Sequence, residues 1–269
     1  MNKLVVITGA SSGIGKELLK LYIRAGDTAV NVSRTNPDGY EPYVYGDLTD
    51  RESIKAAVAE IARRYGKIDV LINNAGIGIS GALELLPEDE IERVFAVNLT
   101  GTVYMTKYAL PLMDRGARIV NISSAAAFFG LPFRGLYCSA KAGVNMLSYS
   151  LRAELRPLGI DVTSVCPGDT KSNFTANRLK NFETAERYGD RIKKAAEGID
   201  LKDGKRMPAE IMARKIYKRI TRKKTRPDYL IGGKMVFLRF ASKFFTRNFF
   251  IKMTDKFFGG HGIKPNKTP

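Results

Sequence analysis

The stretch Thr8-Gly9-Ala-Ser-Ser-Gly13-Ile-Gly15 decides the fold of this chain. It follows the apolar run Leu4 to Ile7, which predicts a buried strand, and it precedes Lys16 to Ala25, which predicts a helix. Glycines let a backbone approach a pyrophosphate, and a helix N-terminus offers free N–H groups and a partial positive charge. The alternative is an ordinary glycine-rich turn, but the strand before and the helix after favour a dinucleotide-binding loop.

Strands and helices continue to alternate beyond this loop. Further strands are predicted at residues 28–33, 43–45, 69–72, 117–122, 160–165 and 229–231, and further helices at 52–65, 88–113, 136–155 and 208–222. Pro111 should bend or end the third of these four helices. The alternation predicts an α/β fold, namely a single Rossmann-type, doubly wound parallel sheet of about seven strands with helices on both faces.

Length and composition limit the number of domains and the kinds of chemistry. A chain of 269 residues with 44% apolar residues suits one catalytic domain, predicted at residues 1–233, with a substrate loop at about 168–206. Residues 234–269 form a predicted C-terminal helical extension. The single histidine, His261, and only two cysteines exclude His-based triads and multi-His metal sites, so no metal is expected. No apolar run of transmembrane length and no signal-peptide pattern is found, which predicts a cytoplasmic protein.

The positive charge is concentrated at the C-terminal end. Residues 201–269 contain 19 Lys and Arg against 4 Asp and Glu, whereas residues 1–200 contain 25 against 23. Residues 1–200 are therefore nearly neutral, and the basic character belongs to the last quarter of the chain. No RNA- or DNA-binding motif accompanies this charge, so nucleic acid is not an expected partner.

Several further motifs follow the glycine loop in a fixed order. They are Asn73-Asn74-Ala75-Gly76, Asn98, Ser123-Ser124, Tyr137-x3-Lys141 and Pro167-Gly168. With the glycine spacing, this series resembles the short-chain dehydrogenase/reductase family over residues 3–235. The resemblance implies an oxidoreductase that acts on CH–OH groups with NAD(P). Two segments, 132–141 and 152–159, resemble the branch related to 17β-hydroxysteroid dehydrogenases, retinol dehydrogenases and acyl-dihydroxyacetone-phosphate reductases, which implies a lipophilic alcohol or ketone.

The end of the second strand indicates which cofactor is used. Ser33-Arg34 stands where an acidic residue would bind the adenosine ribose and repel a 2′-phosphate. A guanidinium can pair with that phosphate, so NADP(H) is favoured over NAD(H). The alternative is that Arg34 is a solvated charge that stacks on adenine.

The resemblance also assigns cofactor contacts elsewhere in the chain. It places Asp47 on the adenine and Asn74 to Gly76 along the ribose. Thr170 and Ser172 depart from the family pattern, which has an apolar residue and a threonine there. The residues expected at the cofactor are Gly9, Ser11, Ser12, Gly13, Ile14, Gly15, Ser33, Arg34, Asp47, Leu48, Asn74, Ala75, Gly76, Tyr137, Lys141, Pro167, Gly168, Thr170 and Ser172.

Tyr137 and Lys141 carry the predicted chemistry. Being four residues apart on a helix, they share one face. A free tyrosine has a pKa of about 10, and a nearby ammonium favours the tyrosinate. Tyr137 is therefore the predicted general acid in reduction and base in oxidation. Ser124, 13 residues earlier, should position the substrate oxygen, whereas Ser123 is interpreted as structural. The resemblance makes Asn98 the anchor of a water in a proton relay to the lysine.

Apolar residues point to a hydrophobic substrate. Ile77, Ile79 and the segment 125–133 are expected to flank the reacting end of the cleft, or alternatively to be core or subunit contacts. Residues 237–258 hold eight of the fourteen phenylalanines, with Arg239, Lys243 and Arg247 between them. This composition suits peripheral contact of residues 234–258 with an anionic membrane. It also suits a cap over the substrate loop or a dimer interface.

These observations predict an NADP(H)-dependent reductase of a steroid-, retinoid- or acyl-lipid-like carbonyl. One alternative is a 3-oxoacyl-carrier-protein reductase, whose acidic protein partner would suit the basic surface. Another is a non-catalytic nucleotide-sensing scaffold, against which the intact Asn98, Ser124, Tyr137 and Lys141 argue. The family resemblance implies a homodimer or homotetramer.

Overall fold

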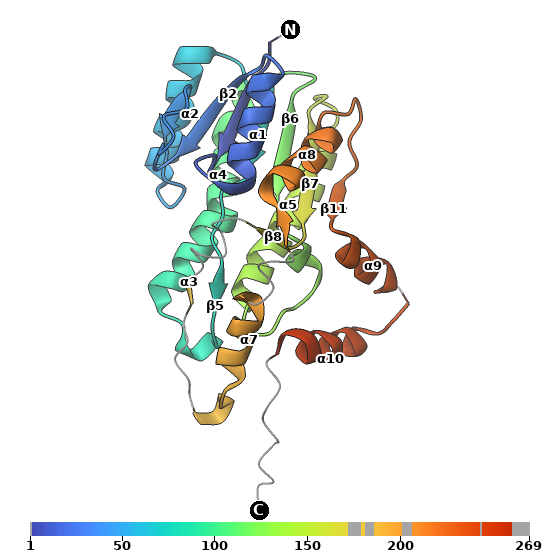
Figure 1. The fold of residues 1–269 in the computed structure, drawn as a ribbon. Coiled ribbons are helices and arrows are strands. Elements are labelled where there is room, and N and C mark those ends of the chain that lie inside the picture. The colour runs from blue at the N-terminus through green and yellow to red at the C-terminus, as the bar shows by residue number, and fades with distance from the viewer. Residues whose placement is uncertain (1, 172–178, 181–185, 201–205, 243, 260–269) are drawn as a thin grey trace, which may run out of the picture.

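The computed structural model describes residues 2–171, 179–180, 186–200, 206–242 and 244–259 (Figure 1). Its centre is a sheet of seven parallel strands, which confirms the predicted fold class. In chain order these strands are β1 (Leu4–Thr8), β2 (Thr28–Ser33), β3 (Tyr43–Tyr45), β4 (Val70–Asn73), β6 (Arg118–Ile122), β7 (Asp161–Pro167) and β11 (Asp228–Ile231). Two short parallel pairs lie outside the sheet: β5 (Ile79–Ser80) with β9 (Leu179–Lys180), and β8 (Thr170–Lys171) with β10 (Met207–Pro208).

Helices cover both faces of the sheet because each central strand is apolar on both sides. In β1, Val5 and Ile7 pack on one face with α1 (Gly13–Arg24) and α8 (Ala209–Ile220). Leu4 and Val6 pack on the other face with α2 (Arg51–Tyr65) and α4 (Gly101–Ala109). The α-helices are α1 (Gly13–Arg24), α2 (Arg51–Tyr65), α3 (Glu88–Phe95), α4 (Gly101–Ala109), α5 (Gly135–Glu154), α7 (Arg191–Asp200), α8 (Ala209–Ile220), α9 (Gly233–Ala241) and α10 (Arg247–Phe258). Short 3₁₀ turns lie at Leu83–Leu85, Leu110–Leu112, Ala125–Phe128 and Glu186–Tyr188.

The helix predicted over residues 88–113 is divided into several pieces. α3 passes into a π-helical turn, Ala96–Thr100, before α4 begins, and Pro111 lies in a closing 3₁₀ turn as expected. The π turn contains Asn98, which is fully buried. Its amide Nδ2 donates to the carbonyl of Val94 at 3.0 Å and to that of Ile77 at 2.8 Å. A side chain that bonds to the backbone of the preceding turn widens the helix locally, which a periodicity of apolar residues cannot reveal.

The strand order places a crevice at the middle of the sheet. The order is β11-β7-β6-β4-β1-β2-β3, so the chain winds outward in both directions from the β1–β4 pair. Ligands of doubly wound sheets bind at the carboxyl ends of the strands, where this reversal occurs. In Figure 1 that end of the sheet faces α3, α7 and α10.

The C-terminal extension returns to this same end of the molecule. Arg239 of α9 forms two hydrogen bonds with Asp228, at 2.6 and 2.9 Å, and Arg191 of α7 pairs with Asp255 of α10 at 2.5 Å. Phe250 of α10 packs against Phe129 after β6, with ring centres 5.9 Å apart. In the part of the chain that the structure describes, no helix has the length and apolar run needed to cross a membrane.

Candidate active site

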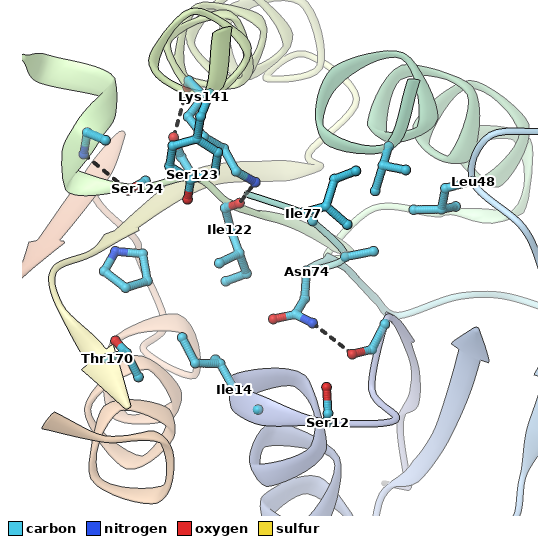
Figure 2. Close-up of a pocket in the computed structure, with 18 of the residues that line it drawn as sticks. Ser12, Ile14, Leu48, Asn74, Ile77, Ile122, Ser123, Ser124, Lys141 and Thr170 are labelled. Carbon is cyan, nitrogen blue, oxygen red and sulfur yellow. Dashed lines mark hydrogen bonds between the residues drawn. The ribbon is translucent and has the colours of Figure 1, made fainter. Parts of the chain in front are cut away.

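A cleft of about 580 Å³ opens at the carboxyl ends of the central strands. Most of the residues predicted at the cofactor or the reacting centre line it: Gly9, Ser11, Ser12, Gly13, Ile14, Ser33, Arg34, Asp47, Leu48, Asn74, Ala75, Gly76, Ser124, Tyr137, Lys141, Pro167, Gly168 and Thr170. Gly15 and Asn98 lie behind its wall, and Ser172 falls outside the described residues. Figure 2 shows Ser12 and Ile14 on one side of the cleft, Ser124 and Lys141 on the other, and Asn74 between them.

The glycine loop is packed against the turn that follows β4. Gly9 has a φ of +66°, and a Cβ there would lie 2.9 Å from the Cα of Ala75. A Cβ on Gly15 would overlap the amide of Asn74, which donates to the carbonyl oxygens of Thr8 and Gly9 at 3.0 and 3.2 Å. Only glycine fits at these two positions. The result is a fixed, shallow cradle in front of the α1 N-terminus, which fits the pyrophosphate of a dinucleotide.

The far end of the cleft presents a cation. Arg34 lines the cleft and is exposed, at the end of β2. Asp38, the next acid along the chain, is paired with Lys16 at 2.7 Å. Asp47 accepts hydrogen bonds from the backbone and hydroxyl of Thr49, so its carboxylate is held within its own turn. The end of the cleft at β2 therefore presents the exposed Arg34 guanidinium together with the Asp47 carboxylate.

Lys141 lies at the floor of the cleft. Its side chain is buried, and its Nζ donates to the carbonyl of Ile122 at 3.0 Å. Burial disfavours the charged form and lowers the pKa of Lys141 to about 8. A Cβ on Gly76 would lie 3.3 Å from this Nζ and 2.7 Å from Oδ1 of Asn98. Gly76 thus allows the lysine and the asparagine to converge from two different helices.

The two adjacent serines have different partners. The hydroxyl of Ser123 donates to the backbone carbonyl of Lys141 at 2.8 Å and so fastens α5 to the end of β6. The hydroxyl of Ser124 accepts from the backbone N–H of Ala126 at 3.1 Å and lines the cleft. Tyr137, half-buried on the first turn of α5, lines the same cleft. Ser124, Tyr137 and Lys141 therefore border one shared space.

The wall beside this group is apolar, but only part of the predicted set forms it. Ile77, Ala125, Ala126 and Leu131 line the cleft. Ile79 instead packs in the core with Val94, and Phe128 and Phe129 pack against the C-terminal extension. The predicted segment therefore divides between substrate wall and helix contact.

Several residues that line the cleft are not among those predicted at the site, including three arginines and one phenylalanine. These four are Arg93, Arg134, Arg206 and Phe258. Arg134 stands one turn before Tyr137, a position that could have suggested it. Phe258 is the last residue of α10, and its ring lies 5.5 Å from the Arg134 guanidinium. The phenylalanine-rich composition marked the segment, but nothing in that composition indicated which ring would reach the cleft.

Comparison with known proteins agrees with this architecture. Residues 3–182 match the short chain dehydrogenase family. The chain is 37% identical over 207 residues to a 3-ketodihydrosphingosine reductase of Bacteroides thetaiotaomicron, an alignment that covers 75% of this chain and 77% of that one. It is 36% identical over 188 residues to a 3-oxoacyl-[acyl-carrier-protein] reductase of Thermotoga maritima, covering 64% and 76%.

A solved structure gives the same result for the fold. A short-chain dehydrogenase from Streptomyces avermitilis is 27% identical, with a TM-score of 0.78 over 95% of this chain and 97% of that one. The family match spans more than half of the chain, and it contains the glycine loop and the Ser124, Tyr137 and Lys141 positions. The chain belongs to the short-chain dehydrogenase family, and it is an oxidoreductase that interconverts carbonyl and CH–OH groups with a nicotinamide cofactor.

Proposed function

We propose that this protein is an NADP(H)-dependent reductase of a lipophilic carbonyl compound and that Tyr137 is its general acid. The observation that carries the proposal is the buried Lys141 ammonium, which shares the cleft with Tyr137 and Ser124. When bound, the nicotinamide supplies the hydride. Residues 1–233 are the proposed catalytic domain and residues 234–269 its extension.

Each side chain around the reacting oxygen has a separate proposed role. Tyr137 gives its proton to the carbonyl oxygen during reduction, and the positive charge of Lys141 favours the tyrosinate that remains. Ser124 positions the same oxygen by a hydrogen bond. Asn98 approaches Lys141 across Gly76 and is the proposed anchor of the relay that returns a proton. Reversing these steps gives oxidation of an alcohol.

Replacing Tyr137 tests the mechanism directly. In Tyr137→Phe the ring stays and the transferable proton is lost, so kcat should fall by roughly 10³-fold. NADPH affinity, measured by fluorescence titration, should change little because the glycine loop is untouched. Substantial remaining turnover would contradict the role of Tyr137.

The proposed preference for NADP(H) rests on Arg34 at the end of the cleft beside β2. Arg34 is exposed there, and the neighbouring Asp38 is occupied by Lys16. Arg34→Ala should lower the ratio of kcat/KM for NADPH over NADH by about 10-fold or more, since a charge-assisted phosphate contact is lost. An unchanged ratio would contradict the assignment. Lys55→Ala on α2 is a matched control, because this exposed cation does not line the cleft.

The lipophilic substrate class is supported by the apolar wall of Ile77, Leu131 and Phe258 and by the name of the Bacteroides relative. Peripheral contact with an anionic membrane through residues 234–258 and assembly into a homodimer or homotetramer belong to the same proposal. A panel of long-chain ketones, steroids, retinal and acyl-dihydroxyacetone phosphate with NADPH would identify the substrate. No oxidation of NADPH by any of them would contradict the proposed class.

A 3-oxoacyl-carrier-protein reductase is the second candidate. The relative from Thermotoga maritima carries that name, and the net charge of +15 over residues 201–269 suits an acidic carrier protein. The two candidates differ in their response to salt and to the carrier. A 3-oxoacyl group on carrier protein that is reduced far faster than the same group on a small thiol would favour this second function.

A further inference from the structure

The C-terminal helices present an aromatic surface to solvent. Five phenylalanines, which we call the aromatic face, are from 46% to 71% exposed: Phe237, Phe240, Phe244, Phe245 and Phe249. Within this set, the ring centres of Phe240 and Phe244 lie 5.2 Å apart and those of Phe245 and Phe249 lie 4.6 Å apart. Soluble surfaces rarely gather large apolar groups in this way unless they bind a partner.

This exposure is not the result of a loosely attached tail. The opposite side of the same helices is packed: Leu238 and Ala241 of α9 and Phe250 of α10 contact the apolar cluster around Phe129 and Leu131. The ion pairs of Arg239 with Asp228 and of Arg191 with Asp255 hold the two helices in place. The aromatic face is therefore presented outward by fixed helices.

The charges beside the aromatic face indicate what kind of partner it fits. Residues 233–259 contain six Lys and Arg and a single acid, Asp255, which is paired with Arg191. Lys252 and Lys256 are exposed and lie three and seven residues after Phe249, so they share its side of α10. Two copies of this surface would bring like charges together, which disfavours self-association. Aromatic rings flanked by cations suit the headgroup region of an anionic bilayer.

We propose that the aromatic face docks on an anionic membrane and that the substrate enters the cleft from it. This inference rests on the proposed lipophilic substrate. α10 belongs both to the aromatic face and to the cleft. Phe249 of α10 is exposed to solvent, whereas Phe258 at its end lines the cleft, with the Arg134 guanidinium 5.5 Å from the Phe258 ring. Docking would thus place the mouth of the cleft at the lipid surface. A water-insoluble ketone could then pass from bilayer to cleft along Phe258.

Vesicle co-sedimentation tests the docking. The full chain should bind phosphatidylcholine vesicles that contain phosphatidylglycerol, and this binding should weaken with added salt. The triple variant Phe237→Ser, Phe240→Ser, Phe249→Ser should bind at least about 30-fold more weakly. Lys252→Gln with Lys256→Gln should lose about 10-fold on anionic vesicles. The control is Ile23→Ser, Leu83→Ser, Leu158→Ser, which removes exposed apolar side chains elsewhere and should bind as wild type does.

Activity measurements separate docking from catalysis. The triple Phe variant should reduce a short, water-soluble ketone within about twofold of wild type, but should lose most activity on a ketone embedded in vesicles. Equal vesicle binding by wild type and the triple Phe variant would overturn the proposal. So would the absence of vesicle binding together with a smaller oligomer in the triple variant, measured by light scattering, because the face would then be a subunit contact. Vesicle binding without reduction of any ketone would leave docking standing and contradict only the proposed function.

Discussion

The glycine loop and the C-terminal extension both contribute to the same cleft, yet they are held in opposite ways. The loop is held by backbone contacts that leave no room for a Cβ at Gly9 or Gly15. The extension is held by side chains, chiefly the Arg239–Asp228 and Arg191–Asp255 pairs and the stacking of Phe250 on Phe129. A backbone cradle tolerates almost no substitution, whereas a docked helix pair can vary as long as its anchors remain. The cofactor end is therefore constrained in sequence and the substrate end is adaptable.

Replacing Lys141 should have the largest effect on activity, because this lysine lies at the floor of the cleft that both regions line. Lys141→Met should reduce kcat by roughly 10³-fold, since the charge beside Tyr137 is lost. The same change should stabilise the fold. A lysine pKa lowered from 10.5 to about 8 by burial costs about 3 kcal/mol at neutral pH, and losing its bond to the Ile122 carbonyl costs the variant about 1 kcal/mol. The free energy of unfolding of Lys141→Met, measured by urea denaturation, should therefore exceed that of the wild type by about 2 kcal/mol.

The gain in the free energy of unfolding should depend on pH in a defined direction. Between pH 8 and 10.5 the unfolded wild type keeps the proton on Lys141 while the folded form releases it, so wild-type stability rises with pH. The advantage of Lys141→Met should therefore be full below pH 8 and shrink above it. An advantage that grows above pH 8 would show that burial does not depress this pKa.

Gly15→Ala breaks the backbone cradle and should have the next largest effect. The added Cβ would overlap the Asn74 amide and lie 2.8 Å from the Gly9 carbonyl oxygen. We expect the Kd for NADPH to rise by about 10-fold and stability to fall by roughly 1–3 kcal/mol. Gly130→Ala is the matched control, because its Cβ would meet open space. Equal behaviour of the two variants in calorimetric titration would refute the argument from packing.

Asp228→Asn loosens the extension and should have the smallest effect. The hydrogen bonds from Arg239 lower the pKa of Asp228, and Tyr149 donates to the same carboxylate at 2.7 Å. The substitution should cost about 1 kcal/mol at neutral pH because the pair is partly exposed. This stabilisation is present above pH 3.8 and is lost as the pH falls through the lowered pKa of Asp228. The free energies of unfolding of the wild type and Asp228→Asn should therefore become equal in acid. NADPH affinity should not change; a large loss would mean that the two regions are coupled.

Much of the cofactor site could be predicted because its determinants are local. The glycine motif lies between one strand and one helix. Tyr137 and Lys141 share a helical face because they are four residues apart, as any i, i+4 pair on a helix does. The distinction between Ser123 and Ser124 rested on spacing alone. Both serines line the cleft, but the Ser123 hydroxyl donates to the backbone carbonyl of Lys141, whereas the Ser124 hydroxyl accepts from the N–H of Ala126; the role of Ser124 stays a prediction.

Other features depend on residues that are distant in the chain. In the π turn, Nδ2 of Asn98 bonds not only to the carbonyl of Val94 in the preceding turn but also to that of Ile77, 21 residues earlier. Every residue from 125 to 133 is apolar or small. Their hydrophobicity therefore could not show that Leu131 lines the cleft while Phe129 packs against Phe250. The periodicity of apolar residues predicts that a side chain is buried, but it does not predict which part of the protein the side chain packs against.

The sequence by itself determined the sheet, and it was enough to predict the loop for the cofactor and the residues proposed to carry the chemistry. These follow from backbone sterics and helical spacing, which act between near neighbours in the chain. Only the tertiary structure decided that Phe258 would line the cleft beside Arg134 and that Phe237 and Phe249 would face solvent. The physical reason is that packing is non-directional: eight phenylalanines within 22 residues can bury any subset of their rings. The subset is chosen by the surface on which the helices come to rest.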